Sequence, residues 1–182
     1  AVFISGTGSN LKNLIKFSLK RKSPIQINLI ITNNPKAIGL RYAKIYKIKK
    51  KIYNYKKKEF SEKKSLNDLK LNDIKLVCLA GFMKILSRDF IKKFKGKILN
   101  IHPSLLPKYK GLKTHERVIK NKEKYSGCTV HLVNSKLDSG KIIIQKKVKL
   151  SKQESPSSLR KKILKHEHKL YPKAISKLFA NL

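Results

Sequence analysis

The stretch "ILNIHPSLLPKYKGLKTH", residues 98–115, places two polar side chains at the end of an apolar run of strand length. Asn100 and His102 stand two residues apart, so in a β-strand their side chains lie on the same face. Pro103 and Pro107 then stiffen the loop that follows. Asn donates an N–H and His can exchange a proton, so we interpret this strand end as a candidate catalytic centre.

Apolar runs of strand length alternate with helical patterns on both sides of this stretch. We predict strands at residues 1–5, 25–32, 51–55, 74–80, 96–102, 127–133 and 141–150. We predict helices at residues 9–21, 37–48, 61–71 and 87–94, from about residue 114, and from residue 155 almost to the end. This alternation predicts an α/β protein, with a mostly parallel, Rossmann-like sheet of about seven strands. The last two strands are joined only by "NSKLDSG", so one late strand should run antiparallel.

The composition favours a single domain over residues 1–182, with its first strand at the start of the chain. There is no apolar run of about 18 residues and no signal peptide, so we expect a cytoplasmic protein with no membrane partner. Cys78 and Cys128 lie in apolar runs, and we interpret them as buried and reduced. No His, Cys or carboxylate cluster has metal-ligand spacing, so no metal site is expected.

The net charge of +35 raises the alternative of a nucleic-acid-binding protein, above all at residues 46–60, "YKIKKKIYNYKKKEF". Only five of the 45 basic residues are arginines, however, and base-reading proteins favour Arg. We therefore interpret the lysines as a coding bias and expect no specific nucleic-acid partner. The ten acidic residues are few enough that each is a candidate for a specific role.

The loop "SGTGSNL", residues 5–11, follows the first predicted strand and opens the first predicted helix. Two glycines allow a tight turn whose free N–H groups attract an anion. Leu11 stands where a dinucleotide fingerprint needs a third glycine, and no Gly-Lys-Ser/Thr ends the loop, so a monophosphate is the expected ligand. The candidate phosphate-binding residues are Gly6, Thr7, Gly8, Ser9 and Asn10. The alternative is a plain glycine turn with Ser9 as N-cap.

Two further loops should lie at the same edge of the sheet, where α/β proteins bind ligands. Asp138 stands in the predicted hairpin; it is either a local turn residue or a carboxylate that faces His102 and favours its protonated form. The stretch "LAGFMKILS", residues 79–87, either lines a pocket for a flat ligand or belongs to the core.

Taken together, these loops resemble the glycinamide ribonucleotide formyltransferases of purine biosynthesis, within the folate-dependent formyltransferase family. The segments that carry the resemblance are "ISGTGSNL", "LAGFMKILS", "LNIHPSLLPKYKGL-TH", "VHLV…LDSG" and "HEH-LYP", which appear in the family's order. The resemblance implies a three-layer α/β/α formyltransferase fold. It also implies formyl transfer from 10-formyltetrahydrofolate, as co-substrate, to the amine of 5′-phosphoribosylglycinamide.

The same resemblance assigns roles to individual residues. By position, Asn100, His102 and Asp138 match the catalytic residues, and residues 6–10 match the phosphate loop. Glu167 matches a carboxylate that binds the sugar nucleotide. The implied folate-binding residues are Met83, Lys84, Ile85, Leu86, Asn134, Leu137 and, for a basic residue after the third strand, Lys63. The folate and catalytic part thus covers residues 79–145. Lys84 stands where the family commonly has Arg.

Three alternative functions remain open at this point. Methionyl-tRNA formyltransferase and formyltetrahydrofolate hydrolase share the Asn-x-His core, but each has a further domain and lacks a loop like "GTGSN". A non-catalytic, basic nucleic-acid-binding protein on this fold is the third. The complete set of Asn100, His102 and Asp138 favours an active formyltransferase.

Overall fold

The computed structural model describes residues 1–180, and the chain divides into two compact units, Ala1–Asn100 and Ile101–Leu182. The first unit holds a parallel sheet in which β1 (Val2–Ile4) lies between β2 (Leu29–Thr32) and β4 (Leu76–Leu79). The strand β3 (Lys49–Ile52) pairs with β2, and β5 (Lys97–His102) pairs with β4. Parallel strands joined by helices are the arrangement that the sequence predicted.

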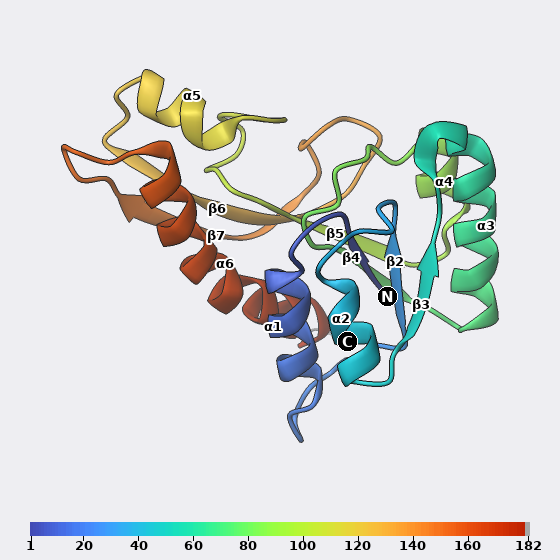
Figure 1. Cartoon of the computed structure of the whole chain (residues 1–182). Helices are drawn as coiled ribbons and strands as arrows, with labels where there is room; N and C mark the ends of the chain where they lie inside the picture. The colour runs from blue at the N-terminus through green and yellow to red at the C-terminus, as the bar shows by residue number, and fades with distance from the viewer. Residues whose placement is uncertain (181–182) are drawn as a thin grey trace. The chain divides into compact units, whose positions relative to one another are not determined.

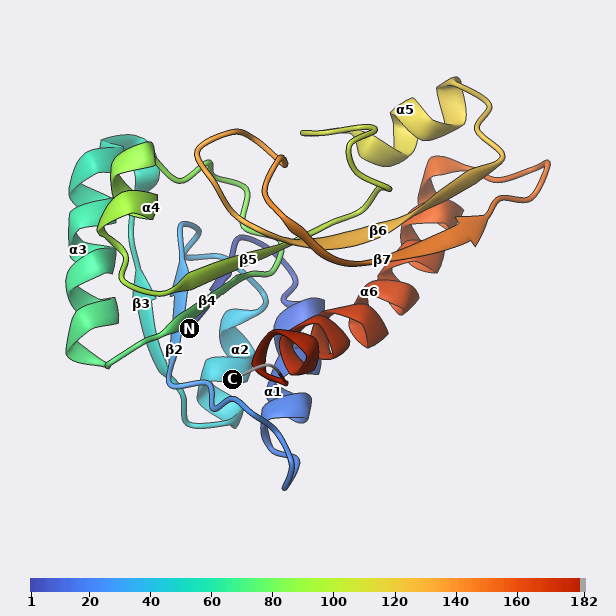
Figure 2. The same cartoon turned by 180° about the vertical axis from the view of Figure 1, so that it is seen from behind.

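Helices cover both faces of this sheet (Figures 1 and 2). On one face lie α1 (Ser9–Ser18) and α2 (Leu40–Ile45), and on the other lie α3 (Lys58–Leu71) and α4 (Arg88–Lys93). The helix α4 begins as predicted, because the Ser87 side chain accepts a hydrogen bond of 3.0 Å from the Phe90 amide. Because both faces are covered, every residue of β1, β2 and β4 is buried, as is typical of parallel sheets.

The second unit is built around an antiparallel hairpin. Its strands are β6 (Tyr125–Leu132) and β7 (Ile142–Lys149), and their antiparallel pairing confirms the prediction of one reversed late strand. The long helix α6 (Pro156–Phe179) packs on this hairpin and also contacts α5 (Thr114–Lys120). Ser155 and Ser158 form a reciprocal capping box at the start of α6.

The third strand lies earlier in the sequence than predicted. We predicted residues 51–55, but the residues that pair with β2 are Lys49–Ile52, and Tyr55–Lys57 forms a 3₁₀ turn, η1. The strand lies at the edge of the sheet and all four of its residues are exposed, so its pairing needs no apolar pattern. The aromatic residues that suggested a strand include Tyr55, which is buried at the turn instead.

Several other predicted elements were too long. The second strand has only residues 29–32 of the predicted 25–32, α1 stops at Ser18 instead of residue 21, and α2 has only residues 40–45 of the predicted 37–48. Among residues 1–180, no helix combines the length and the apolar character that a membrane crossing would need.

Candidate active site

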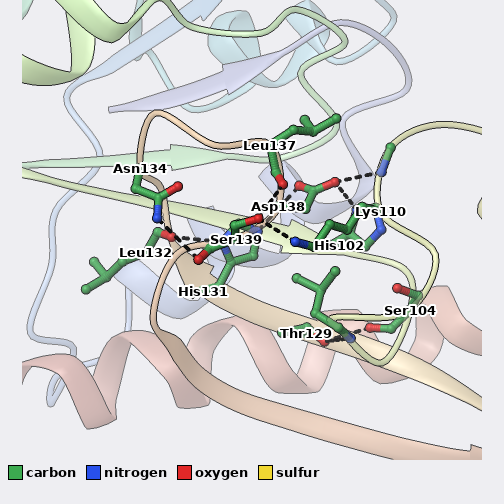
Figure 3. Close-up of polar contacts among 12 residues, drawn as sticks. His102, Ser104, Lys110, Thr129, His131, Leu132, Asn134, Leu137, Asp138 and Ser139 are labelled. Carbon is green, nitrogen blue, oxygen red and sulfur yellow. Dashed lines mark hydrogen bonds and ion pairs between the residues drawn. The ribbon is translucent and has the colours of Figure 1, made fainter.

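The hairpin between β6 and β7 buries Asp138 between two histidines (Figure 3). Its Oδ2 lies 3.4 Å from Nδ1 of His102, and its Oδ1 lies 3.6 Å from Nε2 of His131. The Gly111 amide donates a hydrogen bond of 2.8 Å to the same Oδ2. Asp138 has a positive φ of 46°, which Asp tolerates better than most residues. The hairpin therefore delivers one buried carboxylate to both rings.

The partners of Asp138 keep it ionised despite its burial. Burial alone raises the pKa of this carboxyl group. Hydrogen bonds from His131 and the Gly111 amide, with the charge of His102, outweigh that effect and lower the pKa below its ordinary value. Asp138 is therefore a fixed negative charge near neutral pH.

His102 is held between a carbonyl and this carboxylate. Its Nε2 donates to the Tyr109 carbonyl at 2.8 Å, so this nitrogen carries a hydrogen. Burial lowers the pKa of His102 below its ordinary value, and it outweighs the Tyr109 hydrogen bond and the Asp138 charge, which raise it. The ligand-free ring is therefore mostly neutral near pH 7. The Asp138 contact favours the protonated ring, since a neutral ring with its hydrogen on Nε2 presents a lone pair to the carboxylate.

The loop that follows His102 is anchored to β6. Thr129 donates through Oγ1 to the Ser104 carbonyl at 2.6 Å and accepts from the Leu106 amide at 3.1 Å. Gln145 on β7 donates to the same Oγ1 at 2.8 Å. Ser104 closes the loop on itself with a hydrogen bond of 2.7 Å to the Lys108 carbonyl. These bonds fix the Tyr109 carbonyl, and with it the His102 ring.

Asn100 occupies the same strand as His102. It pairs opposite Leu79 at the end of β4 and is half-buried. Because side chains alternate along a strand, Asn100 and His102 lie on one face of β5. The structure places both residues on β5, and their joint role in catalysis stays a prediction.

His131 is the residue of this cluster that the sequence analysis missed. It is 2% exposed, and its Nδ1 donates to the Leu132 carbonyl at 2.8 Å, which fixes the ring. The signal in the sequence was a titratable side chain within the apolar run "GCTVHLV". His131 stands two residues after Thr129, so the two side chains share one face of the strand. A lone histidine in an apolar strand is more often structural, so the pattern alone did not single it out.

The phosphate loop has the open helix start that anion binding requires. Gly8 is the N-cap of α1, with φ 71°, and no side chain caps the helix there. Ser9 is the first helical residue, so the alternative with Ser9 as N-cap is wrong. A Cβ on Gly8 would lie 2.6 Å from the Gly39 backbone, which explains the need for glycine. Gly6 and Thr7 are exposed, Ser9 is half-buried and Asn10 is buried.

The predicted folate segment presents apolar side chains to solvent. Met83 is 64% and Ile85 63% exposed, and Lys84 is exposed between them, while Leu86 is buried. The loop bends at Gly81, with φ 75°, and the role of these side chains in folate binding stays a prediction. Lys63 is exposed on α3.

The remaining predicted residues lie in the second unit. Asn134 shapes the hairpin loop: it donates to the Ser139 carbonyl at 3.2 Å and accepts from the Lys136 amide at 3.0 Å. Leu137 is 49% exposed on the same loop, and Glu167 is buried on α6. Over the part of the chain that the structure describes, no three His, Cys, Asp or Glu side chains group as a metal site would require.

Known proteins resemble this chain over nearly its whole length. A family model described as formyl transferase matches residues 1–175. Phosphoribosylglycinamide formyltransferase of Haemophilus influenzae is 39% identical over 96% of this chain and 84% of its own length. The human trifunctional purine biosynthetic protein adenosine-3 is 42% identical over 96% of this chain, but the chain spans only 18% of that protein.

Solved structures agree with these sequence matches. The crystal structure of phosphoribosylglycinamide formyltransferase from Bacillus halodurans has a TM-score of 0.93 and 34% identity, over 97% of this chain and 93% of its own. The similarity confirms the predicted fold class, a three-layer α/β/α arrangement with a mostly parallel sheet of seven strands. With its family match from residue 1 to 175 and close relatives along its length, the chain belongs to the formyl transferase family.

Proposed function

We propose that this protein transfers the formyl group of 10-formyltetrahydrofolate to the amine of 5′-phosphoribosylglycinamide. The products are formylglycinamide ribonucleotide and tetrahydrofolate, as in purine biosynthesis. The observation that carries the proposal is the buried Asp138 carboxylate against His102, in a chain similar to phosphoribosylglycinamide formyltransferases. The family match spans both compact units, so we propose that residues 1–182 act as one formyltransferase domain.

Asn100 and His102 serve the charged intermediate of this transfer. The substrate amine attacks the formyl carbon, and the formyl oxygen becomes negative in the tetrahedral adduct. The Asn100 amide and the protonated His102 ring donate hydrogen bonds to that oxygen. The removal of one such donor typically costs about 2.7–4 kcal/mol of transition-state stabilisation.

His102 gains its positive charge by taking up, as the negative oxygen forms, the proton that the attacking amine loses, and it later passes this proton on. In the ligand-free protein burial keeps the ring mostly neutral, and an adjacent negative charge raises the pKa of a histidine. Asp138 also raises the pKa of His102, so a smaller further increase is enough to protonate the ring. As the adduct collapses, the bond between the formyl carbon and the folate nitrogen breaks, and that nitrogen receives the proton that the amine loses. The Nδ1 edge of His102 is the edge that exchanges protons, because Tyr109 holds Nε2.

The remaining residues bind the two substrates. The backbone N–H groups of residues 6–10 hold the phosphate at the uncapped start of α1. Glu167 binds the ribose or the amide of the sugar nucleotide. The folate ring lies against Met83, Lys84, Ile85 and Leu86, with Asn134 and Leu137 from the hairpin loop and Lys63 near its acidic tail. Specific nucleic-acid binding has no part in this function, and we place the protein in the cytoplasm.

A turnover assay with purified protein tests the proposal. Phosphoribosylglycinamide and 10-formyltetrahydrofolate should give stoichiometric tetrahydrofolate and formylated ribonucleotide, and Asn100→Ala should lower kcat about 10²- to 10³-fold. Methionyl-tRNA and water are the two competing formyl acceptors. Preferred formylation of methionyl-tRNA, or release of formate without the ribonucleotide, would contradict the assignment.

A further inference from the structure

Ser5, the residue before Gly6 of the phosphate loop, forms hydrogen bonds through all three of its polar groups, and two of these bonds reach residues 79–87, the stretch that carries the predicted folate residues. It follows β1, the strand between β2 and β4, and is 9% exposed. Its amide donates to the Gly81 carbonyl at 3.1 Å, and its hydroxyl oxygen accepts from the Met83 amide at 2.8 Å. Its carbonyl accepts from the Asn34 side chain at 3.0 Å. Ser5 is thus the chain neighbour of Gly6, the first residue of the phosphate loop, and it accepts a hydrogen bond from Met83, the first residue of the folate segment.

Asn33 fixes which way the Ser5 hydroxyl donates its hydrogen. The Ser5 hydroxyl accepts from Met83 and donates to Oδ1 of Asn33. The chain of bonds runs from the Met83 amide through the Ser5 hydroxyl to the Asn33 carbonyl, and bonds in such a chain polarise one another. Asn33 and Asn34 follow the second strand, where a dinucleotide-binding protein would carry an acidic residue that binds a ribose. In this protein their side chains form hydrogen bonds with Ser5 instead.

The phosphate loop is held on its other side as well. The Gly6 carbonyl accepts from the Gly39 amide at 3.0 Å, and Gly8 packs directly against Gly39. Because the loop is anchored at Gly6 and Gly8, we expect a phosphate that displaces the loop to move the adjoining Ser5 as well. A movement of Ser5 would shift the Met83 amide, and with it the segment that carries the exposed Met83 and Ile85 side chains.

We propose that Ser5 is a positioning residue that couples the two substrate sites, so that each substrate binds more tightly when the other is present. The inference rests on the proposed function, because it takes the phosphate-bearing ribonucleotide and the reduced folate as ligands of these two loops. Coupling of this kind is reciprocal and typically amounts to about 5- to 150-fold in affinity.

The test measures the affinity for tetrahydrofolate with and without saturating phosphoribosylglycinamide, a pair that cannot react. Wild-type protein should bind tetrahydrofolate at least about fivefold more tightly when the ribonucleotide is present. In Ser5→Ala the ratio should fall to within about twofold of unity. In steady-state assays of Ser5→Ala, both KM values should rise more than kcat falls, because Ser5 touches no reacting atom.

Four further variants separate coupling from folding. Ser65→Ala removes another buried serine of the same unit, whose hydroxyl donates to the Ser61 carbonyl at 2.8 Å, and it should retain the wild-type ratio. Ser5→Thr keeps the hydroxyl and should retain part of the coupling. Asn33→Ala removes the acceptor, and the Ser5→Ala/Asn33→Ala double variant should lose no more coupling than Ser5→Ala alone. If Ser5→Ala does not fold, Asn33→Ala must still reduce the ratio.

The outcomes distinguish this inference from the proposed function. If wild-type protein binds neither compound, the proposed function itself fails. If both compounds bind but the wild-type ratio is unity, or Ser5→Ala and Asn33→Ala keep the wild-type ratio, the coupling role of Ser5 is overturned while the enzyme assignment stands.

Discussion

Among single residues, the proposed chemistry depends on opposing influences on the charge of the His102 imidazole. Burial disfavours a positive charge on His102, while Asp138 and the Tyr109 carbonyl favour it. The balance keeps the pKa of the ring below its ordinary value, so the ring is ready to accept charge when a negative oxygen forms beside it.

The charge of Asp138 is testable through Asp138→Asn. The substitution removes one of the contributions that raise the pKa of His102, so that pKa should fall further. If protonated His102 stabilises the transition state, kcat and kcat/KM should both drop, by about 10²- to 10⁴-fold, the usual range for general acid–base groups. The alkaline limb of the pH–rate profile should also move to lower pH, and a stopped assay across pH 5 to 9 measures both effects.

Asp73→Asn is the matched control for that variant. Asp73 also has a left-handed backbone, with φ 47°, but its side chain is 84% exposed and contacts Lys75 at 2.5 Å. The Asp73→Asn variant should therefore keep the wild-type kcat and KM values. If Asp138→Asn lowers the melting temperature and turns over normally once it is folded, then Asp138 is only a turn residue.

The sequence predicted part of this cluster and missed part. Asn100, His102 and Asp138 could be found because polar side chains at strand ends and in tight turns interrupt apolar runs. His131 could not be singled out, because a buried histidine looks the same in the sequence whether its partner is a backbone carbonyl or the Asp138 carboxylate. The same holds for Ser5 in the first unit. The contacts with Asp138 and with the Met83 amide are visible only in the structure.

At the scale of elements, the start of α1 depends on a single backbone conformation. Gly8→Ala should both destabilise the protein and weaken the binding of the ribonucleotide. A left-handed conformation costs an L-residue about 1–2 kcal/mol, and the new Cβ would also lie 2.6 Å from the Gly39 backbone. Thermal unfolding and the KM for phosphoribosylglycinamide measure the two effects.

Gly6→Ala provides the stability control for Gly8→Ala. No atom lies within 4 Å of a Cβ built on Gly6, and its φ is outside the left-handed region. Gly6→Ala should melt close to the wild-type temperature. Equal destabilisation by the two substitutions would mean that the contact with Gly39 does not limit the loop.

The start of α6 carries a charge that makes its stability depend on pH. Glu154 accepts from Ser158, and from Lys162 at 3.1 Å and Ser151 at 3.2 Å. The Ser158 hydrogen bond is the main cause that lowers the pKa of Glu154 to about 2 from 4.5. Its stabilisation is therefore complete above pH 4.5 and is lost as the pH falls from 4.5 through 2.

Glu154→Gln should lower the melting temperature at pH 7 by a few degrees. A surface network of this kind contributes at most about 1 kcal/mol, and about 2–4 °C accompanies each kcal/mol in a chain of this size. The difference from wild type should shrink below pH 4.5 and vanish near pH 2. Glu59→Gln, at an exposed position in the first turn of α3, is the matched control, and it should change the melting temperature at pH 7 less than Glu154→Gln.

Most elements could be predicted because local signals and tertiary structure agree. Buried β2 and β4 are continuous apolar runs, and α4 and α6 begin at serine caps that the sequence shows. The sequence failed at β3, because an edge strand of three lysines and one isoleucine satisfies its pairing without burial. Local pattern carries no information about a partner that lies elsewhere in the chain.

At the scale of the whole molecule, the burial of acids accentuates the positive charge. Four of the ten carboxylates are buried: Glu62, Asp68, Asp138 and Glu167. Glu62 accepts from the Ser87 amide at 2.8 Å at the start of α4, and Asp68 lies 3.5 Å from the Lys51 ammonium group. Because these buried carboxylates are not exposed at the surface, lysines dominate the surface charge. The surface should therefore attract anions of every kind.

This surface should bind nucleic acids only in a non-specific way. Lysine-rich surfaces neutralise phosphates and release counterions, so the affinity should fall about 10³- to 10⁵-fold between 50 and 200 mM salt if 6–10 phosphates are contacted. Near physiological salt the dissociation constant should lie at about 10⁻⁴–10⁻⁶ M.

Fluorescence titrations with duplex DNA of two unrelated sequences and with tRNA, at both salt concentrations, measure these quantities. Because only five arginines are available for bidentate contacts to bases, the three ligands should bind within a few-fold of one another at equal charge. A ligand that binds at nanomolar concentration near physiological salt, with a clear preference over the other two, would show that the lysines form a specific nucleic-acid site.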